Sequence, residues 1–136
     1  PKHVGTTGCY EILHTGQVGL LAGCKGGGDL LVRGLNGDAS VGGQGKTQPS
    51  PVNPFESRAC VLAHLESVDF VVGFEEDTPL RLIEAVRPDV LVKGGDWSLD
   101  KIVGREAVES RGGRVLSLPL LPGFSTTGLI ERIKAL

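Results

Sequence analysis

Residues 8–17 combine a glycine-bearing turn with histidine and glutamine side chains at positions 14 and 17. The run before them predicts a strand at residues 2–7, and the run after them predicts a helix at residues 18–25. The first amide groups of a helix have no intrahelical acceptor, and the helix dipole adds about half a positive charge there. His14 and Gln17 would share one face of the helix start, and Gly16 would allow close approach of a ligand. The stretch therefore predicts a phosphate-binding site. A surface or capping histidine at position 14 is the alternative.

Three further polar segments carry side chains that commonly bind phosphate. Two contain a lysine beside glycines, at positions 46 and 93, and the third is a run of three hydroxyl residues. Ammonium groups and hydroxyls both donate hydrogen bonds to phosphate oxygens. A solvated loop lysine at position 93 and a plain helix cap at residues 125–127 are the alternatives. The candidate groups are Lys46, Lys93, Asp96, Ser125, Thr126 and Thr127.

The tripeptide around Lys46 is not a Walker phosphate loop. That motif, G-x-x-x-x-G-K-[ST], needs glycine at position 40, where the chain has Ser40. No expected strand ends immediately before it either. Lys46 is instead expected to be the main cation of a long loop, residues 36–53, which contains almost no apolar residues.

Alternating strands and helices are expected to bring these segments together. Apolar runs predict strands at residues 2–7, 30–35, 69–74, 89–92 and 114–118. Apolar periodicity and capping residues predict helices at residues 18–25, 54–65, 79–86, 99–111 and 125–133. This order predicts an open α/β fold with parallel strands and helices on both sheet faces. Because ligands bind beyond the carboxyl ends of such strands, the four polar segments are expected at one edge.

The composition is that of one globular domain, and we assign residues 1–136 to a single domain. Apolar residues make up 40% and charged residues 22%, and the net charge of −2 argues against broad nucleic-acid or anionic-membrane binding. No apolar run reaches the length of a membrane helix, and no signal peptide is recognisable. Three cysteines without metal-ligand spacing favour a reducing, cytoplasmic setting. The first residue, Pro1, predicts a processed, trimmed or partial chain.

The gathered groups favour transfer of a phosphoryl or nucleotidyl group. No Ser/His/Asp triad, Cys/His pair or carboxylate dyad stands out in the sequence. What remains is a set of phosphate donors with one or two carboxylates that could hold Mg²⁺ through water. Such reactions need mainly alignment of phosphates and stabilisation of their charge.

Seven stretches together give the chain a family resemblance. They are Thr6-Thr-Gly-Cys-Tyr-Glu-Ile-Leu-His-Thr-Gly-Gln, Gly34-Leu-Asn-Gly-Asp-Ala-Ser-Val, Pro51-Val-Asn-Pro, Phe74-Glu-Glu-Asp-Thr-Pro-Leu, Arg87-Pro-Asp-Val-Leu-Val-Lys-Gly-Gly-Asp-Trp, Ile102-Val-Gly and Gly123-Phe-Ser-Thr-Thr. With these the chain resembles the cytidylyltransferase-like nucleotidyltransferases, and most of all the adenylyltransferase domain of the ADP-heptose synthases. The resemblance covers nearly the whole chain.

The resemblance implies a Rossmann-like three-layer sandwich with a five-stranded parallel sheet. It implies transfer of AMP from ATP to a heptose 1-phosphate with Mg²⁺, a step in lipopolysaccharide core biosynthesis. It also implies a homodimer and often a fused sugar kinase domain. Catalytic roles fall on His14, Gln17 and Lys46. Nucleotide binding falls on Thr7, Gly8, Cys9, Tyr10, Gly16, Lys93, Gly94, Asp96, Ser125, Thr126 and Thr127, and substrate binding on Glu11, Asn36 and Asp38.

The chain departs from the family pattern at several positions that would carry charge. Gln17 stands where the second histidine of H-x-G-H is expected, and Tyr10-Glu11 replace Phe-Asp. Residues 42–46 lack the family's basic pair, and Ser50 lies where an arginine is expected. Three outcomes stay open: slowed adenylyl transfer, a nucleotide-binding module with little or no turnover, or a related transferase that uses CTP or another phosphorylated acceptor.

Overall fold

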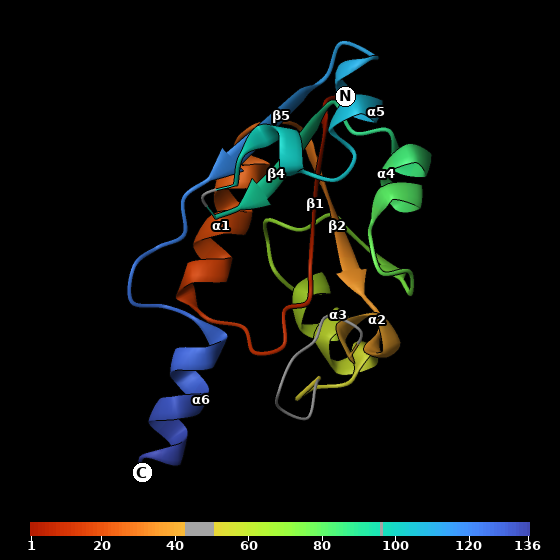
Figure 1. Ribbon diagram of the computed structural model, residues 1–136. Helices are drawn as coiled ribbons and strands as arrows, with labels where there is room; N and C mark the ends of the chain where they lie inside the picture. The colour runs from red at the N-terminus through yellow and green to blue at the C-terminus, as the bar shows by residue number, and fades with distance from the viewer. Residues whose placement is uncertain (43–50, 96) are drawn as a thin grey trace.

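A five-stranded parallel sheet forms the centre of the computed structural model, which describes residues 1–42, 51–95 and 97–136 (Figure 1). The strand order is β3-β2-β1-β4-β5, and every neighbouring pair is parallel. The direction of strand addition reverses at β1, which pairs with β2 on one side and β4 on the other. All five expected strands are present, and the expected α/β, Rossmann-like fold is confirmed. The strands are β1 (His3–Gly8), β2 (Leu30–Asn36), β3 (Phe70–Phe74), β4 (Val90–Gly94) and β5 (Arg114–Leu118).

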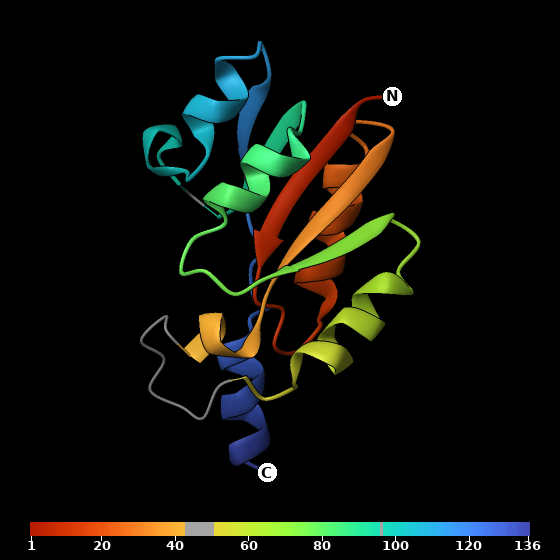
Figure 2. The same ribbon diagram turned by 90° about the vertical axis from the view of Figure 1, so that its right-hand side faces the viewer.

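Helices cover both faces of this sheet, as expected (Figure 2). On one face α1 (Thr15–Lys25) and α3 (Phe55–Ala63) bury Leu21 and Leu62 in a cluster with apolar residues of β1, β2 and β4. On the other face α4 (Leu80–Val86) contributes Ile83 to a second cluster. The two clusters make the three-layer arrangement.

A short helix, α2 (Asp38–Gly42), occupies part of the segment 36–53 that we expected to be a loop. This helix is about one turn long and packs through Val41, which is fully buried. Ser40 anchors it, because its hydroxyl accepts a hydrogen bond from the Asn36 side chain at 2.9 Å. Tertiary contacts of this kind stabilise a turn of helix that the local sequence would not form alone.

The continuous helix expected at residues 99–111 is wrong: the structure has a 3₁₀ turn, η1 (Leu99–Lys101), followed by α5 (Arg105–Glu109). Gly104 separates them with a φ of +91°, a left-handed conformation that ends a right-handed helix. A Cβ at this position would lie 2.8 Å from Ile83 Cδ1. Glycine therefore also allows α4 to pack close to the start of α5.

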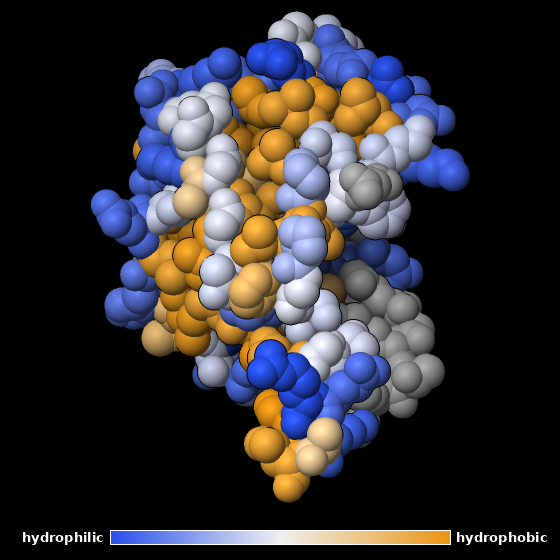
Figure 3. All heavy atoms as spheres, turned by 90° about the vertical axis from the view of Figure 1, so that its left-hand side faces the viewer, coloured by the Kyte–Doolittle hydropathy of each residue, from blue (hydrophilic) through white to orange (hydrophobic). Residues whose placement is uncertain are grey.

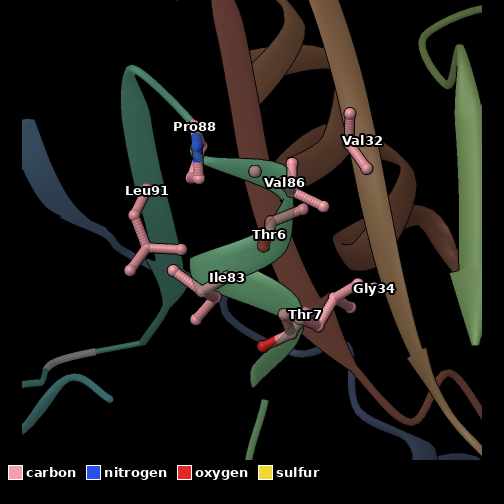
Figure 4. Close-up of a pocket in the computed structure, with 10 residues that line it drawn as sticks. Thr6, Thr7, Val32, Gly34, Ile83, Val86, Pro88 and Leu91 are labelled. Carbon is pink, nitrogen blue, oxygen red and sulfur yellow. The ribbon is translucent and has the colours of Figure 1, made fainter. Parts of the chain in front are cut away.

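α4 packs directly on β1 and β2 where Gly34 leaves room for it (Figure 4). A Cβ on Gly34 would lie 2.8 Å from Thr7 Cγ2 and 2.9 Å from Leu82 Cδ2. The gap that remains under α4 is about 10 Å³ and is lined mostly by apolar side chains such as Val32 and Ile83. A volume of this size holds about one water. It is a packing gap rather than a ligand site.

The last helix, α6 (Thr126–Lys134), stands away from the layered body (Figure 1). None of its residues is buried. Figure 3 shows apolar surface spread over the neighbouring face and again at the tip of the molecule where α6 ends. Exposed apolar residues near this helix include Phe124 and Ile133. Among the residues that the structure describes, no helix has the length and apolar character needed to cross a membrane.

Candidate functional site

The turn after β1, residues 9–14, has no exposed residue and leads directly into α1. Tyr10 has a φ of +47°, uncommon for a residue with a side chain, and its ring is buried. α1 begins at Thr15, three residues before the expected start, and His14 is its N-cap. The His14 carbonyl accepts hydrogen bonds from the amides of Gln17 and Val18 at 3.0 and 3.1 Å. Its side chain makes no capping bond. The first amides of α1 therefore have no side-chain acceptor and are available to an anion.

The His14 ring and the segment before α6 meet at Gly16. A Cβ on Gly16 would lie 3.1 Å from the His14 ring atoms Cε1 and Nδ1, and also 3.1 Å from Phe124 Cβ. Since Phe124 immediately precedes Ser125, the imidazole lies beside the start of α6, as the topology predicts. Desolvation lowers the pKa of the His14 imidazole below its ordinary value, which favours the neutral ring at pH 7.

His14 and Gln17 each keep a buried polar atom without a partner among the described residues. These atoms are Nδ1 of His14 and Oε1 of Gln17. Most buried polar groups in proteins have a hydrogen-bond partner, so two orphans at one helix start call for an explanation. A phosphate oxygen at the start of α1 would accept a hydrogen bond from Nδ1 of His14 in the tautomer that carries its proton there, whereas Oε1 of Gln17 is an acceptor and needs a donor such as a hydroxyl.

Arg33, in the middle of β2, is completely buried and unpaired. Its Nε and both Nη atoms have no acceptor within the part of the chain that the structure describes. The guanidinium carbon lies 3.5 Å from the centroid of the Tyr10 ring, and Nη2 would lie 2.6 Å from a Cβ on Gly8. Burial lowers the pKa of Arg33 to about 10, so the guanidinium remains charged at neutral pH. No described residue accepts a hydrogen bond from this positive charge, which lies beneath the turn.

Arg58, on α3, ties the same turn to the segments that follow β2. Its Nη1 donates hydrogen bonds to the carbonyl oxygens of Cys9 and Asn36 at 2.8 and 2.7 Å. Its Nη2 pairs with Asp38 Oδ1 at 2.7 Å, and its Nε donates to the Asn53 carbonyl at 2.9 Å. One buried guanidinium thus fixes three backbone carbonyls and one carboxylate around the turn.

The three residues assigned to substrate binding lie in or beside this Arg58 network. Asp38 Oδ1 also accepts a hydrogen bond from the Phe55 amide at 2.9 Å, at the start of α3. The buried Asn36 side chain is bonded to Ser40. The Glu11 carbonyl accepts a hydrogen bond from Asn53 Nδ2 at 2.8 Å, and Glu11 is buried. These contacts hold the turn in place, whereas contact with a substrate stays a prediction.

Lys93 lies near the end of β4 beside a cavity of about 120 Å³. Its ammonium is 5.3 Å from the centroid of the Trp97 ring, and burial lowers the pKa of this lysine. The Trp97 indole donates a hydrogen bond to the Gly94 carbonyl at 3.0 Å, which fixes the ring over the strand end. Thr7 and Lys101 line the same cavity. Most of the lining is apolar, with Ile83 and Ile102 among its residues, and Thr7, Lys93 and Lys101 are its polar residues.

The hydroxyl trio lies at the start of α6, as expected. Ser125 is the N-cap of the helix, and its Oγ accepts a hydrogen bond from the Gly128 amide at 2.9 Å. The hydroxyl proton of Ser125 stays able to donate to a ligand. Thr126 is half-buried and Thr127 is exposed.

Two predicted site residues, Lys46 and Asp96, lie outside the described residues. Within residues 1–42, 51–95 and 97–136, no group of three or more His, Cys, Asp or Glu side chains is arranged to hold a metal ion. The described residues therefore do not form a protein cage for Mg²⁺. A magnesium ion carried by phosphates needs only one or two protein ligands.

The sequence reading missed both buried arginines. Arg33 interrupts the apolar run Leu30–Asn36, and a charged residue in a strand expected to be buried on both faces is the signal that would have marked it. Arg58 lies on a helix whose apolar face was recognised, but its position gives no hint of four acceptors from distant segments. Such a network is visible only in three dimensions.

The sequence comparisons identify relatives of the chain. The family model described as cytidylyltransferase-like matches residues 6–132. The chain is 54% identical over 127 residues to the bifunctional protein HldE of Nitrobacter hamburgensis and 53% identical over 130 residues to that of Geobacter sulfurreducens. These matches cover 93% and 96% of the chain but 26% of each relative. The chain thus spans about a quarter of the length of the curated relatives it matches.

Solved structures share the same fold. A lipopolysaccharide core biosynthesis protein from Thermoplasma volcanium superposes with a TM-score of 0.72 and is 26% identical, over 88% of this chain and 96% of that one. Pantothenate synthetase from Thermus thermophilus superposes with a TM-score of 0.57 over 97% of this chain and 64% of its own. At 18% identity the second likeness concerns the fold alone.

Proposed function

The chain belongs to the cytidylyltransferase-like family, and from this premise we propose that it is an adenylyltransferase of ADP-heptose synthesis. The reaction is transfer of AMP from ATP to a heptose 1-phosphate. An oxygen of the sugar phosphate attacks the α-phosphorus of ATP, the bond from that phosphorus to the bridging oxygen breaks, and pyrophosphate leaves. The HldE relatives and the lipopolysaccharide core biosynthesis neighbour support this choice of pathway.

The observation that carries the proposal is the meeting of His14, the first turn of α1 and the start of α6 at Gly16. This edge offers free helix amides, a buried imidazole nitrogen without a partner and a serine hydroxyl. All of these groups bind phosphate oxygens, and fixed donors of this kind stabilise the charge that develops in phosphoryl transfer. We assign the triphosphate to this position.

The acceptor sugar phosphate is assigned to the cavity beside Lys93. That cavity lies next to β4, the neighbour of β1 across the switch in strand order, where ligands of open α/β folds bind. Lys93 and Lys101 would neutralise the sugar phosphate, and the Trp97 ring would cover it. Mg²⁺ enters with ATP as part of the substrate and neutralises phosphate charge when bound.

The test is pyrophosphate release by the full chain supplied with ATP, Mg²⁺ and heptose 1-phosphate, with mass-spectrometric detection of ADP-heptose. We expect both products in equal amounts. A related enzyme that has both histidines of H-x-G-H serves as the positive control. No pyrophosphate from this chain, with the control active, would contradict the proposal.

A nucleotide-binding module without turnover is the second candidate, and Gln17 is the observation that favours it. An amide can donate a hydrogen bond to a phosphate but cannot carry charge, and a charge-assisted bond is stronger by about 1 kcal/mol. Calorimetry that shows tight ATP binding without pyrophosphate release would support this candidate. A panel of ATP, CTP, GTP and UTP separates both from a transferase that uses another base.

The relatives are named bifunctional and are about four times longer than this chain. We therefore propose that the chain works next to a second catalytic domain, a sugar kinase that would produce the sugar phosphate. Homodimer formation is proposed as well. Size-exclusion chromatography with light scattering of the full protein tests it, and a monomer at micromolar concentration would contradict it.

A further inference from the structure

Arg33 is the largest side chain that is fully buried in the described structure, and its charge has no partner there. Buried charges are normally paired or hydrogen-bonded, because removing an ion from water is costly. The neutral Tyr10 ring is stacked on the guanidinium. A structural arginine would have found acceptors, as Arg58 does.

The position of the charge relates it to the anion site. The guanidinium lies against Gly8, the last residue of β1, and stacks on Tyr10, and both residues belong to the segment that leads into α1. Its field reaches the sheet edge, because the positive charge of Arg33 contributes to the lowered pKa of Lys93. The protein between the guanidinium and that edge has a low dielectric, which screens less than water does.

We propose that Arg33 is a positioning cation of the phosphate-binding turn: it attracts the polyphosphate bound at the start of α1 from below, without touching it. The inference rests on the proposed function, because the polyphosphate is taken to be the triphosphate of the bound nucleotide. The Tyr10 ring holds the guanidinium in place by a cation–π contact. The turn therefore combines the partial charge of the helix start with one full charge that solvent cannot reach.

The test is calorimetric titration of the full chain with inorganic tripolyphosphate, which has no base and needs no acceptor. We expect Arg33→Met to weaken binding about tenfold, since it removes one charge at short range in a poorly screened site. Arg33→Lys, which keeps the charge, should stay within about threefold of the parent chain. Arg114→Met is the control. It removes the same charge from the first residue of β5, at the amino-terminal ends of the strands and away from the start of α1.

Thermal unfolding separates this role from a structural one. Replacing a buried unpaired charge with an apolar side chain of similar length should raise the Tm by about 3–10 °C. Weaker tripolyphosphate binding with an equal or higher Tm supports the proposal. A lower Tm, or failure of Arg33→Met to fold, shows that Arg33 stabilises the fold and overturns the proposal. Unchanged tripolyphosphate binding by Arg33→Met, or no binding by the parent chain, also overturns it.

A measurement on the parent chain needs no folded Met variant. The ¹⁵N resonance of Arg33 Nε, assigned by comparison with Arg33→Lys, should shift as tripolyphosphate is added. A resonance that stays fixed at saturation contradicts the proposal. These binding measurements do not depend on turnover. If the Arg33 variants bind tripolyphosphate as expected but the parent chain releases no pyrophosphate from ATP, only the adenylyltransferase assignment is refuted.

Discussion

Arg58 and Arg33 are both buried next to the turn after β1, and they differ in their hydrogen bonds. Arg58 makes four hydrogen bonds of 2.7 to 2.9 Å to backbone and carboxylate oxygens. Arg33 makes none with the described residues and is in contact with an aromatic ring. The same side chain thus serves two purposes on two sides of one loop: Arg58 fixes its shape, and Arg33 supplies charge.

The contrast extends to the other polar residues of this edge. Asn36 and Asp38 belong with Arg58, because their side chains already have partners inside the protein. His14 and Gln17 belong with Arg33, because each leaves a buried polar atom unpaired. We infer that satisfied groups hold the turn and unsatisfied groups act on its ligand, by contact or through their charge, and four substitutions test this division.

The largest effect is expected for Arg58→Met. Its removal leaves three buried carbonyl oxygens and Asp38 without their donor, so the free energy of unfolding should fall by about 3–5 kcal/mol. Urea denaturation followed by circular dichroism measures the loss. Arg81→Met, at an exposed position of α4, should change the stability by less than about 0.5 kcal/mol. A loss below about 1 kcal/mol for Arg58→Met would remove the distinction between the two arginines.

His14→Ala should have the next largest effect, and on turnover rather than stability. Loss of one donor that stabilises charge in the transition state should lower kcat about 100-fold, or about 2.7 kcal/mol in activation free energy. The Tm should stay within about 2 °C, because no described residue loses a hydrogen bond to the ring. His64→Ala, whose ring is bonded to the Cys60 carbonyl on the surface, is the control. A fall in Tm with unchanged kcat would place His14 among the structural groups.

Gln17→His should raise the rate of pyrophosphate release about tenfold, or about 1.4 kcal/mol in activation free energy. The buried Oε1 of Gln17 can only accept, whereas a protonated imidazole donates a charge-assisted bond to a phosphate. The assay is the same steady-state measurement at pH 7. Gln17→Asn, which shortens the side chain without adding charge, should not increase the rate, and an increase there would point to a steric cause.

The smallest effect is expected for Ser125→Ala. Its Oγ has one internal partner, so Ser125 combines a structural bond with a proposed ligand contact. Loss of the cap should destabilise α6 by about 1 kcal/mol and speed hydrogen exchange of the Gly128 amide. Thr127→Ala, in the helix after the cap, should leave that exchange rate unchanged. Equal exchange in the two variants would show that the cap contributes nothing.

The sequence predicts the fold well because its strong signals are local. Each apolar strand run, and the serine cap of α6, can be recognised within a few consecutive residues. The helix α2 has no such local signal, because it depends on contacts of Ser40 and Val41. The break at Gly104 depends on a left-handed backbone conformation and on the close approach of Ile83.

The sequence predicts where the candidate site lies better than it predicts the role of each residue there. Parallel topology alone places the turn after β1 near the segment before α6, and the contact of Gly16 with His14 and Phe124 agrees. Roles are harder, because a polar side chain at the right edge can be bound to the protein or free for a ligand. The family resemblance assigns Asn36 and Asp38 to substrate binding, and only the geometry reveals their internal partners.

The central place of β1 sets the order in which the chain can fold during synthesis. β2 follows β1 closely, but the second neighbour, β4, pairs with residues about 86 positions earlier, as the bond from the His3 amide to Asp89 shows. At translation speeds of about 5–20 residues per second, one edge of β1 stays open for roughly 4–17 s. An open apolar edge is a template for intermolecular pairing, so nascent chains of this protein should depend on chaperones until the fourth strand leaves the ribosome.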